Sequence, residues 1–366
     1  SLSMHPLYLR CIRGLGNVKC VAICDDLNLM GCAKDVLAAF DNFETDLAGT
    51  GLVIRKEKCG LLWPRGVACP DDIQAASLKR GIQLSHGTML TLGMLVGSGD
   101  KEIDTWLADR VTNHKRYFDL IFHPELPVQI AMLLMRLSAV PQMGYLSRVV
   151  PPRLLRRHAV SFDNMVMAAC VQKLTLPSPL PIAAQFTLNL PIKLGGFGLR
   201  SVYSVSVPAY FSAVAQSVPD ILASVDWAKR VELLSECPTQ APFARQVDLC
   251  LKALLAAKVP AGPKGFIPMD LASYWETYDT ERGAPGLQRV LSANLENTSL
   301  QARLADNKTP VREVQRLLRM QELGLPHIPC LMLYLSPMMI SRLLLNIDWD
   351  CRMLMVYLIS ANVAKG

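Results

Sequence analysis

The sequence predicts an α+β protein in which mixed α and β structure over residues 1–99 is followed by a mainly helical chain. A hairpin pattern and an adjacent amphipathic segment near the N-terminus indicate the mixed part. After about Gly99, apolar residues recur at helical spacing in one segment after another. At 366 residues, the chain is long enough for two or three domains with substantial cores.

The hairpin pattern consists of two short apolar runs, residues 18–24 and 27–30, on either side of Asp25 and Asp26. Such a hairpin places two carboxylates at its tip, where they repel each other unless a cation neutralises them. Because Mg²⁺ prefers oxygen ligands, the pair is a candidate metal site for phosphoryl chemistry. A solvated Asp-Asp turn is the alternative for the dipeptide alone.

An amphipathic helix is expected directly after the hairpin, over residues 34–49, with Gly49 as its C-terminal cap. Short apolar stretches then follow at residues 51–54, 58–64 and 92–97. Together with the hairpin, they complete the mixed N-terminal region.

Three further helices are expected over residues 102–122, 128–140 and 153–174, the second bounded by Pro127 and Pro141. They form a helical domain over residues 100–175. Residues 176–206 are rich in proline and glycine and predict an extended linker, with a tight turn at residues 195–198. That turn also has the glycines of a phosphate-binding loop, but not the full fingerprint. A helical C-terminal region over residues 207–366 completes the chain.

Composition favours a folded intracellular protein and permits a nucleic-acid partner. The formal net charge is +7 with a pI near 8.8, and 51% of the residues are hydrophobic. The 11 cysteines contain no C-x-x-C pair, which predicts reduced, buried thiols rather than a zinc site. Reduced thiols indicate an intracellular compartment, and the sequence does not distinguish the nucleus from an organelle. The most apolar stretch, residues 328–345, is interrupted by prolines and an arginine, so no membrane span or membrane partner is expected.

Two groups of arginines are candidate nucleic-acid contacts. The first group lies around the start of the expected 153–174 helix and consists of Arg148, Arg153, Arg156 and Arg157. The second lies along one side of an expected helix over residues 310–323 and consists of Arg312, Arg316 and Arg319, at positions i, i+4 and i+7. Arginine binds phosphate through paired donors. A solvated or protein-paired face is the alternative for both groups.

The order of these features resembles the C-terminal half of a reverse transcriptase from a non-LTR-type retroelement. In that family a catalytic A-[YF]-x-D-D hairpin precedes G-L-x-x-N-x-x-K-C and a primer-grip hairpin reading L-G-x-P-I-G. The corresponding stretches are A-I-C-D-D at 22–26, G-L-V-I-R-K-E-K-C at 51–59 and L-G-M-L-V-G at 92–97. Farther along, residues 133–148, 162–163 and 195–201 look like the family's thumb and post-thumb regions. The family's aromatic residue, Asn and Pro are replaced by Ile23, Arg55 and Leu95.

The resemblance implies a partial palm over residues 1–99 and a thumb over residues 100–175. It assigns Asp25 and Asp26 to the catalytic Mg²⁺ site and Lys58 to the neighbourhood of the incoming nucleotide. Leu92, Gly93 and Met94 would be primer-grip-like residues. The family's fingers and its other metal-binding Asp would lie upstream of Ser1, so polymerisation by this segment alone is not expected.

The resulting functional hypothesis is a reverse-transcriptase-derived palm–thumb segment that binds RNA within a larger complex. The RNA would be a template–primer or a structural RNA, and other protein chains would cover the exposed palm. One alternative is the C-terminal half of an active RNA-directed DNA polymerase completed by an upstream fingers–palm part. Others are a domesticated structural subunit of a ribonucleoprotein, such as an organellar ribosome, and an unrelated α-rich scaffold protein.

Overall fold

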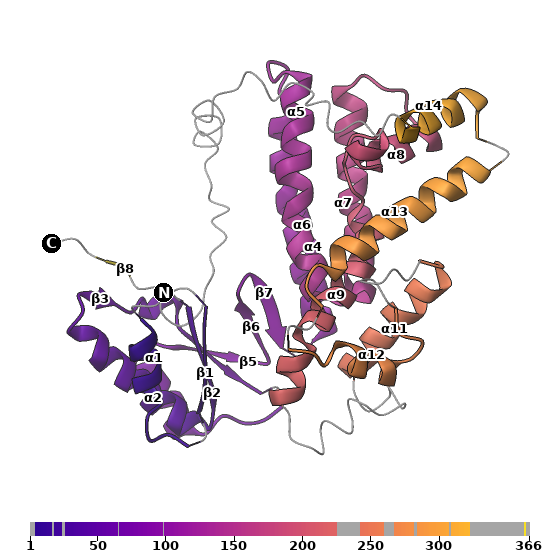
Figure 1. Ribbon diagram of the computed structural model, residues 1–366. Helices are drawn as coiled ribbons and strands as arrows, with labels where there is room; N and C mark the ends of the chain where they lie inside the picture. The colour runs from indigo at the N-terminus through magenta and orange to yellow at the C-terminus, as the bar shows by residue number, and fades with distance from the viewer. Residues whose placement is uncertain are drawn as a thin grey trace. The chain divides into compact units, whose positions relative to one another are not determined.

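The protein divides into two compact units, an N-terminal unit built on Ser1–Ile103 and a helical unit built on Asp104–Tyr334 (Figure 1). The computed structural model describes residues 4–16, 18–23, 26–64, 66–97, 99–224, 242–259, 267–281, 284–306, 309–322 and 362–363. Most of the described residues are helical, and the N-terminal unit adds small two-stranded sheets. In this coarse form the predicted α+β class is confirmed.

The N-terminal unit begins with helix α1 (His5–Cys11), the antiparallel strands β1 (Val18–Ile23) and β2 (Asp26–Gly31), and helix α2 (Ala33–Ala48). The apolar face predicted for α2 is buried as expected. Its buried side chains are those of Val36, Leu37, Ala39, Phe40, Phe43 and Leu47. The Tyr8 ring of α1 stacks on Phe43 with 5.6 Å between centroids, which joins α1 to α2.

The rest of the N-terminal unit forms three more two-stranded ladders, so the strands do not make one continuous sheet. Strand β3 (Leu52–Val53) pairs with β8 (Asn362–Val363), and the 3₁₀ turn η1 (Lys56–Lys58) follows it. Strands β4 (Gly60–Trp63) and β5 (Gln83–His86) are parallel, because helix α3 (Asp71–Lys79) connects them. Strands β6 (Thr88–Thr91) and β7 (Met94–Gly97) form a hairpin.

The helix expected to stop at Pro141 continues through it. Helix α4 (Asp100–Ile121) is followed by α5 (Val128–Leu134), and the π-helical turn η2 (Met135–Ala139) then joins α5 to α6 (Val140–Val149) without a break. In the wide turn, the Val140 amide bonds the Met135 carbonyl, five residues back. An interior proline lacks the amide that a regular helix needs, and the π turn provides a place where the chain accommodates it.

The predicted extended linker is wrong for much of its length. Helix α7 (Pro152–Lys173) lies where a helix was expected, but α8 (Ile182–Asn189) and the 3₁₀ turn η3 (Ile192–Leu194) occupy the proline-rich segment. Pro181 is the N-cap residue of α8, a position at which a proline interrupts no helical hydrogen bond. Leu188 and Leu190 are buried, so this segment is part of the packed helical unit.

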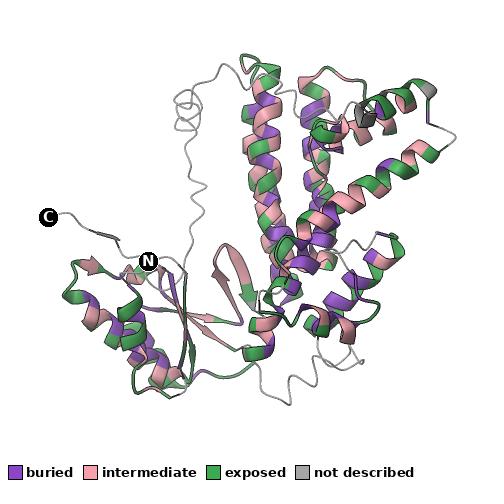
Figure 2. Cartoon of the chain, viewed as in Figure 1, coloured by how far each residue is buried: buried purple, intermediate pink, exposed green. Residues whose placement is uncertain are grey.

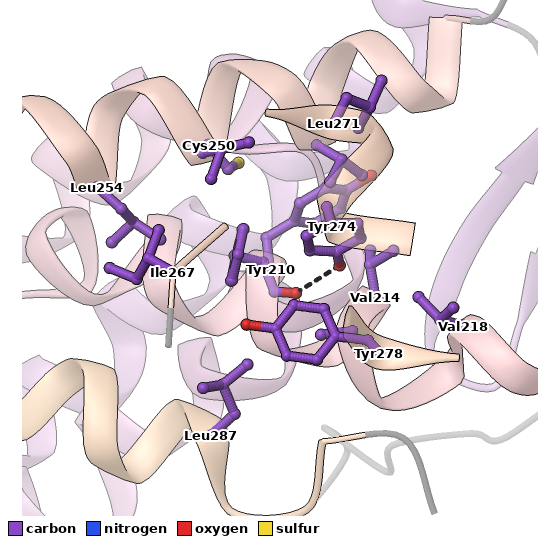
Figure 3. Close-up of a cluster of buried hydrophobic side chains, with 14 of the residues drawn as sticks. Tyr210, Val214, Val218, Cys250, Leu254, Ile267, Leu271, Tyr274, Tyr278 and Leu287 are labelled. Atoms are coloured by element: carbon purple, nitrogen blue, oxygen red, sulfur yellow. Dashed lines mark hydrogen bonds between the residues drawn. The ribbon is translucent and has the colours of Figure 1, made fainter. Parts of the chain in front are cut away.

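Helix α9 (Val202–Ser224) is the central element of the helical unit. It packs against α6, α7, α11 (Pro242–Ala256), α12 (Leu271–Tyr278) and α13 (Leu287–Ala305), and buried and exposed positions alternate along the long helices (Figure 2). In the core around α9, the Tyr274 hydroxyl donates a 3.1 Å hydrogen bond to the Phe211 carbonyl (Figure 3). Helix α14 (Val311–Glu322) is the last described helix of this unit.

Two predictions from composition, buried thiols and no membrane span, can be compared with the described residues. Burial raises the pKa of Cys11, Cys59, Cys170 and Cys250 to about 12, as expected for buried thiols. Among the described residues, no helix is both long and apolar enough to cross a membrane. The apolar stretch at 328–345 lies outside the described residues.

Candidate nucleic-acid interface

The β1–β2 hairpin places Asp26 inside the fold rather than at an exposed tip. The strand register pairs Ile23 with Asp26, so a two-residue connection joins the strands. Asp26 is the first residue of β2 and is only 3% exposed, and the next residue, Leu27, is fully buried. The tip prediction is therefore wrong for Asp26, because the strand begins one residue earlier than expected. Asp25 lies outside the described residues.

The described residues around this hairpin do not fit a magnesium ion by themselves. No group of three or more His, Cys, Asp or Glu side chains comes together in a metal-binding arrangement anywhere in the described part of the chain. Asp26 contributes one buried carboxylate, whereas a two-metal site needs several carboxylates around both ions.

Lys58 is the last residue of η1 and is partly exposed. The strand that follows it, β4, pairs with β5 and not with the β1–β2 ladder. Hydrogen bonding within a sheet therefore does not join Lys58 to the hairpin that carries Asp26.

The primer-grip-like residues form a tight hairpin turn. Leu92 and Gly93 connect β6 to β7, and both have positive φ, 47° and 75°. Positive φ at both central residues is characteristic of the type I′ turn that joins tightly paired strands. Met94 opens β7 opposite Thr91. The hairpin is present, and its role at a primer stays a prediction.

The glycine-rich turn at 195–198 does not offer backbone amides to a phosphate. The amides of Phe197 and Gly198 donate to the Thr187 and Leu190 carbonyls, and those of Gly195 and Gly196 donate to Ile192 and Pro191. A Cβ on Gly196 would lie 2.5 Å from the Leu190 carbonyl carbon. The glycines therefore allow close packing of the turn on α8 and η3, and the structural interpretation of this motif is correct.

Three arginines of the first group lie on neighbouring helices of one packed set. Arg148 lies in the last turn of α6, and Arg153 and Arg156 lie in the first two turns of α7; all three are exposed. The Arg156 guanidinium lies 5.7 Å from the centroid of the Tyr203 ring on α9, and Tyr203 is itself 42% exposed. An Arg148 Nη2 donates to Gln216 of α9 at 3.4 Å. We call Arg148, Arg153, Arg156 and Tyr203 the arginine face.

Arg157 has a different environment from Arg156. Its guanidinium pairs with the Asp104 carboxylate of α4, and the same carboxylate lies 2.7 Å from Nε2 of His158. Burial, together with the Arg157 charge, lowers the pKa of His158. Arg157 therefore joins α7 to α4. For this residue the alternative interpretation holds, in which the arginine pairs within the protein and not with nucleic acid.

The second arginine group is only partly described. Arg312 and Arg319 are exposed on α14, and the Arg316 side chain lies outside the described set. Leu317 on the opposite side is fully buried, while Leu318, which was expected beside it, is 42% exposed because it projects about 100° farther around the helix. Glu313 of the same helix pairs with Arg303 of α13.

Sequence reasoning missed Tyr203 and Gln216 as members of the interface. Both lie on α9, far from the arginines along the chain, and reach them because α9 packs on α6 and α7. No spacing or motif connects residues that only helix packing brings together. Comparison of the whole chain with protein-family models, curated proteins and solved structures returns no match.

Proposed function

We propose that this chain is a palm–thumb segment derived from a reverse transcriptase and that its helical unit binds the phosphate backbone of RNA. The ordered series of motifs supports the derivation. The arginine face supports the binding, and its pairing of Arg156 with the exposed Tyr203 ring is the observation on which this proposal depends.

The arginine face has the chemistry that nucleic acids require. Guanidinium groups bind phosphate oxygens through two parallel hydrogen bonds. An exposed aromatic ring beside them can stack on an unpaired base, and the ring face also stabilises the neighbouring cation. Arg157 is excluded from the face because Asp104 already neutralises it.

A salt titration of RNA binding by the full chain tests this proposal. Removing one arginine that binds a phosphate should lower the slope of log K against log salt by about 0.7–0.9. Arg153→Ala combined with Arg156→Ala should therefore lower the slope by about 1.5 and weaken binding to every RNA sequence similarly. Lys115→Ala with Arg116→Ala is the matched control, because it removes two exposed charges from α4. Equal slopes in both double variants would remove the arginine face from the proposal.

A primer-extension assay of the full chain with a template–primer and Mg²⁺ distinguishes the enzyme alternative from the structural-subunit alternative. Primer extension that disappears in Asp26→Asn would favour the polymerase alternative. Binding without extension favours a structural role, in which partner proteins cover apolar surface such as the exposed Val21 and Met30 side chains of the β1–β2 hairpin.

A further inference from the structure

A small pocket lies among α8, the start of α9 and α13 in the helical unit. Its volume is about 150 Å³. Apolar walls include Phe186 and Val205, and polar side chains include Asn189, Arg200 and Glu296. A cavity of about this volume is large enough for one six-membered ring. The pocket therefore matches a single small ring in size.

Asn189 provides an unused hydrogen-bond acceptor at this pocket. Its Oδ1 atom is buried and has no hydrogen-bond partner among the described residues. Buried acceptors are nearly always paired, because an unpaired one loses its hydration without compensation. A ligand that places an N–H group in the pocket would supply the missing donor.

The charges at the pocket cancel. Arg200 Nε lies 2.8 Å from Glu296 Oε1, so one cation and one anion form a pair in the pocket wall, although the buried Oε1 atom accepts no hydrogen bond from the described residues. A guanidinium has five N–H donors, and this pair occupies only those that face Glu296. The N-terminus of α9, which would otherwise attract an anion, is already capped by the Asp163 carboxylate. These features favour a neutral ligand with a hydrogen-bond acceptor over a phosphate.

We infer that this pocket binds one neutral pyrimidine base, which donates an N–H to Asn189 Oδ1 and accepts a hydrogen bond at a ring carbonyl from Arg200. Cytosine and uracil both carry the required donor and acceptor on a single six-membered ring. The base is either free or part of an unpaired strand, and the chemistry of the pocket is the same for both. The inference does not depend on the arginine face.

The test is calorimetric titration of the full chain with cytosine and uracil, and separately with oligocytidylate and an abasic strand of the same length. Ser204→Tyr should block the pocket entrance and weaken binding at least tenfold, because Ser204 lines the pocket and is exposed. Ser217→Tyr is the matched control, since it adds the same ring to an exposed position farther along α9. Asn189→Leu should cost about tenfold through the lost hydrogen bond, and Asn164→Leu on α7 should not.

Binding of free bases that both pocket variants weaken, with both controls unchanged, supports the inference. A preference for oligocytidylate over the abasic strand that Ser204→Tyr removes would identify a strand as the source of the base. Absence of base binding at millimolar concentration in both arms would overturn the inference, and so would binding that Ser204→Tyr and Asn189→Leu leave unchanged. Inorganic phosphate that competes with cytosine would also overturn it, because the pocket would then be an anion site.

Discussion

Asp163 of α7 accepts a 2.7 Å hydrogen bond from the hydroxyl of Ser201, the residue directly before α9. The same carboxylate accepts hydrogen bonds from the amides of Val202 and Tyr203, at 2.9 and 3.1 Å. It therefore caps the central helix from a neighbouring helix, in addition to the local N-cap residue Ser201, whose Oγ accepts a 3.1 Å hydrogen bond from the Ser204 amide. Burial raises the pKa of Asp163, and these three hydrogen bonds oppose that shift.

Asp163→Ala should lower the free energy of unfolding by about 2 kcal/mol, because two amides and a hydroxyl lose their acceptor. Urea denaturation followed by circular dichroism measures the change. Asp119→Ala removes an exposed carboxylate from α4 and should change stability by less than about 0.5 kcal/mol. A loss no larger than this control would mean that solvent caps α9 equally well.

Stability should fall as the pH drops through about 6.5, in part because of His158. Its folded-state pKa is lowered, so the unfolded chain binds a proton more readily, and acid then favours unfolding. The Asp104 carboxylate, which would favour the protonated ring, is shared with Arg157. Unfolding free energies measured from pH 8 to 5.5 should therefore depend less on pH in His158→Gln than in the parent.

His123→Gln is the control for this pH dependence, since His123 is exposed. A parent and a His158→Gln variant with parallel pH profiles would contradict the lowered pKa. Nuclear magnetic resonance titration of the His158 ring measures the pKa of His158 independently.

Gly196→Ala and Gly144→Ala should have opposite effects on stability. A Cβ at Gly196 would lie 2.5 Å from the Leu190 carbonyl carbon, so backbone must move, at a cost of about 1–3 kcal/mol. A Cβ at Gly144, inside α6, meets nothing within 4 Å, and alanine should stabilise that helix by about 0.5–1 kcal/mol. Thermal unfolding of both variants measures the two changes in stability. Changes of the same sign would contradict the close packing of the turn against Leu190.

The Arg303–Glu313 pair should contribute more than surface pairs to the docking of α14 on α13. Its side chains are only 16% and 10% exposed, with Nη2 and Oε2 3.2 Å apart. Arg303→Met leaves the Glu313 carboxylate poorly solvated and should cost about 3 kcal/mol. Lys34→Met breaks the Lys34–Asp72 pair, whose side chains are 75% and 61% exposed, and should cost about 0.5 kcal/mol.

A double-mutant cycle isolates the pair itself. Arg303→Met with Glu313→Leu should recover much of the stability that Arg303→Met loses, because the buried Glu313 carboxylate is then absent and Asp306, a second ion-pair partner of Arg303, is 43% exposed. Additive losses in the cycle would show that the two side chains act independently.

Local pattern predicted much of the fold but failed where tertiary packing overrode it. The buried face of α2 and the limits of α7 follow from helical spacing, which acts within a few residues. The passage of the helix through Pro141 depends on a π turn, and α8 forms in a proline-rich segment where Leu188 and Leu190 find a core. Neither outcome is visible in the spacing of apolar residues.

In the candidate sites, too, some features follow from local sequence and others depend on tertiary packing. The sequence by itself determined that arginines gather at the start of α7, and the resemblance implied a hairpin at residues 92–97, since both features are local. Only the tertiary structure decided that Arg157 pairs with Asp104 while Arg156 lies over Tyr203, and that Asn189 and Glu296 line one pocket. These pairings depend on how helices distant in sequence pack together, and hydrophobic periodicity specifies the buried face of a helix but not the helix that will cover it.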